Sequence, residues 1–285
     1  MIELVYENNR GQKINLTQLP YWTNVEPIMD YSWDYTKREK RRGGIVAGFT
    51  KNISEKSLVL HIMGHSKSVR DNAIDEFNSV IESDIYDGVP GKIWCGNWYT
   101  YGYIVASQNE KWQYDAPVMK KTITLVREQD SWYRQTVKKS YEGDAYTPDA
   151  ESWDKGYEPS YDYKFDYMTD FESSVQLTNP DVLPSNFILA IQGEAQQPEI
   201  HIGDNVIQFN YDVPEGAVLE VNAVTKTTVV HMPDGVDMNV FGARNADYYI
   251  FERIPSGRSA VTWNGTFNWE ITLIEERSEP RWLTV

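Results

Sequence analysis

The sequence predicts a mainly β protein of two domains, the first of which contains a single helix. Three observations support this fold class. Aromatic residues make up 13% of the chain, many short runs alternate apolar with polar residues, and only one segment has helical periodicity. Aromatic and β-branched residues are enriched in strands, and alternation indicates strands with one buried face. A length of 285 residues suits two domains of ordinary size.

Residues 1–140 are expected to form the first domain, from strands around one helix. The expected elements, in chain order, are the strand Leu58–Met63, the helix 69–82, an aromatic strand pair formed by Cys95 with Trp98–Val105, and the strand Lys121–Val126. Apolar residues recur at helical spacing from Val69 to Ile81. Ser68 stands just before them and is expected to cap the helix. The aromatic strands are expected to turn at Gly96-Asn97 or at Gly102.

An acidic segment follows this domain. Residues 141–172 hold ten acidic and two basic residues, a local net charge of −8. Proline and glycine interrupt its first part, so residues 141–160 are predicted to be a connector. Aromatic residues alternate with other residues over Tyr161–Tyr167, which predicts a strand with one aromatic face.

Residues 161–285 are predicted to form an antiparallel β-sandwich. The expected strands are Phe187–Ile191, a hairpin around Gly203-Asp204-Asn205, Val218–Val221, Thr227–Val230, Tyr249–Phe251 and a last hairpin formed by Ala260–Trp263 with Thr266–Ile274. Asn264-Gly265 separates the arms of that last hairpin and suits a type I′ turn. Its second arm alternates apolar and polar residues cleanly from Phe267 to Leu273, which is typical of a strand with one face in a core.

The charge and the N-terminus bear on partners and location. The net charge is −15, which disfavours binding to nucleic acid or to anionic membranes. The first residues show no signal peptide, and no apolar run approaches the ~18 residues needed to span a bilayer. Synthesis in a cytoplasm is therefore expected.

No pattern of catalytic or metal-binding residues stands out. Cys95 is the only cysteine, so neither a disulfide nor a thiolate metal site is expected. His61 and His65 are four residues apart but on a predicted strand, which does not align them as a helix would. Nucleophilic serine motifs and phosphate-binding glycine loops are absent. The sequence therefore predicts no enzyme, no cofactor and no metal.

One basic cluster runs against the overall charge. Five of the six residues from Lys37 to Arg42 are basic, directly before Gly43-Gly44. Two interpretations stay open: a solvated hairpin tip, or an electrostatic contact with an acidic neighbouring subunit. The residues predicted for a subunit interface on this ground are Lys37, Arg38, Arg41 and Arg42.

Taken in order, these segments resemble the distal tail (Dit) protein family of siphophages that infect Gram-positive bacteria. In the first half the resemblance rests on the order of strands, helix and aromatic strands. The second half is more specific, and the resemblance runs through these segments: Tyr161–Tyr167, Phe187–Gly193, Gln197–Ile200, Tyr249–Gly257 and Glu276–Trp282.

The resemblance implies a structural role. The family's first domain is a β-sandwich-like unit with a helix that forms a hexameric ring, and its second domain is a galectin-like sandwich. Implied partners are further copies of the chain, the tail tube protein, the tail-tip protein and a receptor-binding protein, at the tail tip of the virion. Buried aromatic side chains dominate such interfaces, so Tyr99, Tyr101 and Trp112 are expected to be anchors.

Two other functions remain as alternatives. Exposed Trp and Tyr on the second domain would suit a carbohydrate-binding module for cell-wall glycans, although the sugar-binding residues of galectins cannot be traced in residues 180–285. Glycan hydrolysis needs two carboxyl groups roughly 5–10 Å apart. The acidic segment offers carboxylates, but none has apolar neighbours that would raise its pKa.

Overall fold

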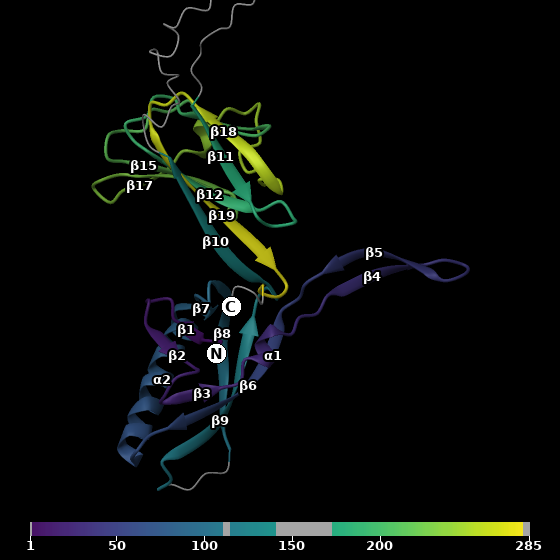
Figure 1. Ribbon diagram of the computed structural model, residues 1–285, viewed down its shortest axis with the longest axis vertical. Helices are drawn as coiled ribbons and strands as arrows, with labels where there is room; N and C mark the ends of the chain where they lie inside the picture. The colour runs from purple at the N-terminus through teal and green to yellow at the C-terminus, as the bar shows by residue number, and fades with distance from the viewer. Residues whose placement is uncertain (1, 111–114, 141–172, 282–285) are drawn as a thin grey trace, which may run out of the picture. The chain divides into compact units, whose positions relative to one another are not determined.

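The computed structural model describes residues 2–110, 115–140 and 173–281 (Figure 1). The chain divides into two compact units: unit 1 comprises Met1–Arg134 with Glu276–Val285, and unit 2 comprises Gln135–Glu275. Antiparallel strands dominate both units, which confirms the prediction of a mainly β fold. The chain enters unit 2 within strand β10 (Trp132–Ser140) and returns to unit 1 within β19 (Asn268–Arg277).

Part of the predicted domain plan falls outside the described residues. The connector 141–160 and the strand Tyr161–Tyr167 belong to this part. The predicted domain ranges 1–140, 141–160 and 161–285 therefore stay a prediction.

Unit 1 is built from two sheets that share strand β8. Besides the start of β10, its elements are β1 (Leu4–Glu7), β2 (Lys13–Asn15), β3 (Tyr21–Thr23), α1 (Glu26–Met29), β4 (Asp34–Glu39), β5 (Gly44–Thr50), β6 (Ser54–Met63), α2 (Lys67–Asp87), β7 (Gly91–Cys95), β8 (Trp98–Asn109) and β9 (Val118–Arg127). The first half of β8 pairs with β7, which continues through β1 to β2. The second half pairs with β9, which continues through β6 to β3. The predicted turn at Gly96-Asn97 is present between β7 and β8.

Gly102 marks the place where β8 changes partner. It pairs with Gly91 of β7, and the next residue, Tyr103, pairs with Val126 of β9. A Cβ on Gly102 would lie 2.8 Å from the backbone oxygen of Val126. The two strands can therefore approach this closely only because residue 102 has no side chain.

Helix α2 covers the core of unit 1 and is longer than the predicted range of 69–82. Its apolar face, with Ala73 and Phe77 at its centre, is buried as predicted. The cap is Ser66, not Ser68, because the Ser66 side chain accepts a hydrogen bond from the Val69 amide at 3.4 Å. The helix runs on past Ile81 because polar contacts hold its last turns, and apolar periodicity does not report such contacts.

Asp84 is the centre of those polar contacts. Its side chain is fully buried and accepts hydrogen bonds from the Tyr6 hydroxyl at 2.5 Å and from the Asn9 amide at 2.7 Å. Burial and the Asp84 carboxylate raise the pKa of Tyr6, so this hydroxyl stays protonated and donates. The helix ends at Gly88, which takes the left-handed conformation with a φ of 65°.

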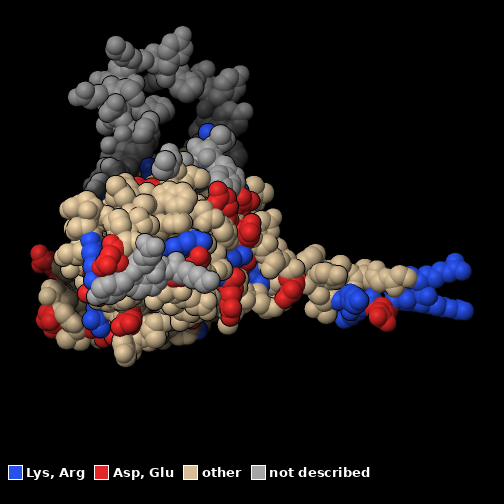
Figure 2. Space-filling model, turned by 90° about the horizontal axis from the view of Figure 1, so that it is seen from below, with Lys and Arg blue, Asp and Glu red and all other residues tan. Residues whose placement is uncertain are grey.

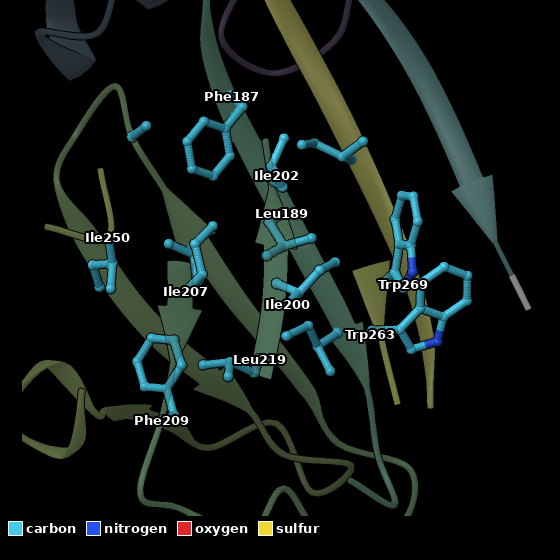
Figure 3. Packing of buried hydrophobic residues seen from close by; sticks show 14 of the residues in the cluster. Phe187, Leu189, Ile200, Ile202, Ile207, Phe209, Leu219, Ile250, Trp263 and Trp269 are labelled. Carbon is cyan, nitrogen blue, oxygen red and sulfur yellow. The ribbon is translucent and has the colours of Figure 1, made fainter. Parts of the chain in front are cut away.

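Unit 2 is a sandwich of two antiparallel sheets. Its elements besides β10 and β19 are β11 (Ser173–Asn179), β12 (Asn186–Gln192), β13 (Glu199–Ile202), β14 (Asn205–Gln208), β15 (Val218–Asn222), β16 (Thr227–His231), β17 (Asp237–Asn239), the 3₁₀ helix η1 (Phe241–Ala243) and β18 (Gly257–Trp263). One sheet has the order β17-β16-β15-β12-β19-β10 and the other β11-β18-β13-β14. Inward side chains of both sheets form one apolar core (Figure 3).

The predicted last hairpin is wrong, although both of its strands exist. β18 pairs with β11 and β13, whereas β19 pairs with β12 in the other sheet. Asn264-Gly265 therefore connects the two sheets across the core instead of joining neighbouring strands. Trp263 and Trp269 flank this connection with centroids 5.4 Å apart at 90°, both buried (Figure 3). A positive φ at Gly265 serves either connection, so the dipeptide alone does not distinguish them.

The predicted strand Tyr249–Phe251 is also wrong. These residues lie in a turn, where Ile250 and Phe251 are both buried and Tyr249 is exposed. Two consecutive buried residues do not fit the alternation of a strand. The apolar residues Ile250 and Phe251 correctly indicated burial, but a buried residue need not lie in a strand.

Candidate assembly surface

A two-stranded hairpin, β4–β5, projects from unit 1 (Figure 1). We call residues 34–50 the arm. Among the described strands, β4 and β5 pair only with each other, and every residue in them is exposed. The turn closes with a hydrogen bond of 2.9 Å from the Lys40 amide to the Gly43 oxygen. The basic cluster Lys37–Arg42 lies along β4 and in this turn, so Lys and Arg gather toward the free end of the arm (Figure 2).

One face of the arm carries three exposed apolar side chains beside Lys37. Tyr35 of β4 lies opposite Phe49 of β5, and the two side chains are 61% and 64% exposed. Val46 lies on the same face, opposite Lys37, and is exposed as well. An isolated hairpin without a covered face is at best marginally stable in water. The arm thus has the composition of an element that another surface covers.

A buried ion pair fixes the root of the arm. Arg127 and Asp130 are fully buried and form a salt bridge. Asp130 accepts a hydrogen bond from the Ser32 amide at 3.2 Å, and Arg127 donates to the Asp30 oxygen at 3.3 Å. Burial lowers the pKa of Arg127 to about 10, which still leaves it charged at neutral pH.

A second set of contacts holds the returning strand. The Lys51 ammonium donates to the Ser131 hydroxyl at 2.7 Å and lies 4.7 Å from the centre of the Trp33 ring. Ser131 donates in turn to the Glu276 carboxylate at 2.8 Å. Both ends of the arm are therefore attached to unit 1, while its two faces are exposed among the described residues.

The residues predicted for an interface fall in two places of unit 1. Lys37, Arg38, Arg41 and Arg42 are all exposed on the arm. Tyr99 is only 3% exposed and packs on Tyr101 and Tyr133, with ring centroids 5.4 and 5.9 Å away. Tyr101 is the more exposed of the predicted pair, so it is the one that can reach a neighbour. Trp112 lies outside the described residues.

The described residues do not bring together a metal-binding set. None of their His, Cys, Asp and Glu side chains form a group that could hold a metal ion. Cys95 is fully buried, and burial raises the pKa of its thiol to about 12. Within the same ranges, no helix combines the length and the apolar character needed to pass through a bilayer.

Unit 2 carries a surface pocket that the sequence patterns did not reveal. It has a volume of about 470 Å³, and its lining includes Phe241, Arg244, Asp247, Tyr248 and Tyr249. Phe241, Tyr248 and Tyr249 are exposed, whereas a fourth aromatic residue of the lining, Phe251, is buried. The Arg244 guanidinium lies 3.7 Å from the centre of the Phe241 ring and donates to the Phe241 oxygen at 2.7 Å. The pocket forms from irregular segments, which periodicity does not describe.

Comparison with known proteins gives likeness at the level of structure. No family model and no curated protein matches the sequence. The phage SPP1 Dit protein (gp 19.1), described as a paradigm of the hub adsorption apparatus in phages infecting Gram-positive bacteria, is 13% identical with a TM-score of 0.58. The similarity covers 97% of this chain and 99% of that one.

Two chains of the phage P2 baseplate in its activated conformation are also similar. The one determined with Ca is 10% identical, with a TM-score of 0.59 over 98% of this chain and 99% of that chain. The one determined with Sr is 11% identical, with a TM-score of 0.61 over 98% and 100%. The chain therefore adopts the fold of the phage SPP1 Dit protein, and the Dit-like architecture that the sequence resemblance predicted is confirmed.

Proposed function

We propose that this chain is a structural, non-enzymatic subunit of a phage tail tip. Copies of it form a ring, with six as the expected number, which joins the tail tube to the tail-tip protein and the receptor-binding proteins. The Dit-like fold over nearly the whole chain supports this role. It would be synthesised and assembled in the cytoplasm of the host bacterium and would act at the tail tip of the virion.

The arm is the observation that carries the proposal. It is anchored at its root, apolar on one face and basic toward its end, whereas the whole chain has a net charge of −15. A second copy is therefore the partner whose charge suits it best. Stable interfaces of obligate assemblies bury roughly 2,000 Å² or more, and an arm reaching onto a neighbour adds such area without enlarging the core.

Electron microscopy of the purified full-length protein tests the proposal. Negatively stained particles should show rings with a central hole, and sedimentation should show a species several times the mass of one chain. A variant with residues 36–48 replaced by a short turn should remain folded and sediment as a monomer. If the parent protein were monomeric at every concentration and formed no ring with its tail partners either, the proposal would be wrong.

The pocket on unit 2 favours a second candidate function, glycan binding. Exposed aromatic rings beside a few charged groups suit a sugar, whose apolar face packs on a ring while its hydroxyls bond to polar groups. A volume of about 470 Å³ lies in the usual range of small-ligand pockets. Binding to a panel of cell-wall glycans, lost in Tyr249→Ala, would support this candidate, and a panel without any binder would remove it.

A further inference from the structure

The outer face at the end of α2 carries exposed apolar side chains. Glu82, Ile85 and Tyr86 are spaced three and one residues apart, which places them on one side of the helix, and Val89 follows directly after the Gly88 cap. Tyr86 is 84% exposed and Ile85 is 47% exposed, and Val89 is exposed too. The core-facing residues, such as Phe77, lie on the other side. We call Glu82, Ile85, Tyr86 and Val89 the α2 patch.

The charges of α2 are arranged against its dipole. The helix begins with its two basic residues, Lys67 and Arg70, and its last turn holds acids and no base. A helix C-terminus carries partial negative charge and favours cations nearby. Within this unit, Arg10 supplies a cation by forming a salt bridge of 2.9 Å with Asp87. Tyr6 and Asn9 donate hydrogen bonds to Asp84. Glu82 adds a further exposed negative charge beside the apolar side chains.

The arm is complementary to the α2 patch in its apolar side chains and in its charge. Its apolar face, with Tyr35, Val46 and Phe49, suits the exposed Ile85 and Tyr86. Its basic end suits the exposed Glu82 beside them, since the last turn of α2 itself holds no base. A pairing of apolar residues at helical spacing with a complementary partner surface is a common recognition mode for helices.

The two surfaces lie on opposite sides of unit 1. In Figure 1, α2 runs along one side of the unit, and the arm departs from the other. An arm attached at its root therefore cannot cover the α2 patch of its own chain. Two different, complementary surfaces on opposite sides produce head-to-tail contacts, which close into a ring when the rotation between copies permits.

We infer that the α2 patch receives the arm of a neighbouring copy. This inference rests on the proposed function and names the partner surface within it. It assigns the donor role to the arm and the acceptor role to Glu82, Ile85, Tyr86 and Val89.

Cysteine cross-linking tests this pairing directly. Val46→Cys and Tyr86→Cys are made in separate full-length chains, mixed and oxidised. Native Cys95 is fully buried and gives little background. The mixture should give a covalent dimer that neither variant gives alone, since a disulfide needs Cα atoms within about 7 Å. A chain carrying both cysteines should give a ladder of covalent oligomers. Val46→Cys mixed with Val224→Cys, on an exposed residue of unit 2, measures chance collisions.

A truncation at the patch supplies an independent measurement. Tyr86→Ala should weaken self-association by about 10-fold to 100-fold, with no change in melting temperature because the side chain makes little contact within the chain. Tyr86→Phe keeps the ring and should associate like the parent.

The outcomes separate the two proposals. In one outcome the parent forms rings and loss of the arm abolishes them, but Tyr86→Ala forms rings like the parent and no cross-link forms. The α2 patch is then not the acceptor, and the proposed function stands. If the parent itself never assembles, the proposed function fails and this inference fails with it.

Discussion

At the scale of single residues, buried polar pairs hold two parts of unit 1 in place. Arg127 with Asp130 holds the root of the arm, and Tyr6 with Asp84 holds the end of α2. Each pair sits beneath a surface that we assign to assembly. Buried residues beneath these surfaces therefore position the two surfaces that we propose to meet.

Loss of one member of a buried pair should be costly. Asp130→Ala leaves the Arg127 guanidinium buried without its counter-ion, and we expect the free energy of unfolding to fall by about 3–5 kcal/mol. Urea unfolding followed by tryptophan fluorescence measures this. Arg127→Leu with Asp130→Leu removes both charges and should cost less than the single change. Equal stability of Asp130→Ala and the parent would contradict the role given to the pair.

The raised pKa of the buried Cys95 thiol predicts how stability depends on pH. The folded pKa of Cys95, about 12, lies above the unfolded value of about 8.5. Its contribution to stability is therefore fully present below about pH 8.5 and is lost as the pH rises toward 12. Cys95→Ser titrates in neither state over this range, so the stability of the parent should fall more steeply than that of the variant between pH 8.5 and 10.5. Parallel stability curves would contradict the prediction.

At the scale of elements, sequence patterns located strands well and their pairing less well. β6, β9 and β12 lie where their sequence patterns predicted strands, and the alternation in β9 also reports which of its faces is buried. Pairing between β18 and β19 was predicted wrongly because a two-residue turn with glycine fits both a hairpin and a link between sheets. The last turns of α2 were missed because hydrogen bonds to Asp84 hold them, and these partners lie 75 residues or more away in the chain.

Sequence patterns also revealed only part of the candidate assembly surface. The cluster Lys37–Arg42 was visible in the sequence because its charge opposes that of the chain. Its apolar companions Tyr35 and Phe49 were not, because a strand with one apolar face normally indicates a core. Only the position of the strand, outside any larger sheet, shows that this face is open.

Gly102 of β8 and Gly48 of β5 offer a matched pair of substitutions at this scale. Gly102→Ala places a methyl group 2.8 Å from the Val126 oxygen, and we expect a loss of about 1–3 kcal/mol in unfolding free energy. Gly48→Ala on the arm meets no atom within 4 Å and should leave stability unchanged. Thermal or urea unfolding compares the two. A Gly102→Ala variant as stable as Gly48→Ala would mean that the change of partner in β8 tolerates a side chain.

At the scale of the whole molecule, charge separates the arm from the rest of the chain. The cluster Lys37–Arg42 holds five basic residues in a chain whose net charge is −15. Opposite charges that meet in an assembly raise the rate of encounter and select the partner.

Salt should therefore weaken self-association. Raising the salt concentration from about 0.1 M to 1 M shortens the Debye length from about 10 Å to about 3 Å. We expect the association constant of the parent to fall by about 10-fold, as measured by sedimentation. The variant Arg41→Gln with Arg42→Gln should associate more weakly at 0.1 M and respond less to salt. A salt response as strong as that of the parent would exclude these two residues from the contact.

The path of the chain also sets an order in time. Unit 2 interrupts unit 1, so the residues from Glu276 onward reach unit 1 only after the whole of unit 2 has been translated. Ser131, which holds Lys51 at the root of the arm, takes its second partner from Glu276. A nascent or truncated chain lacks that contact and presents an arm with a looser base. Synthesis of Glu276 thus precedes completion of the root of the arm, the surface that we propose for assembly, and copies without this residue should be incorporated less readily.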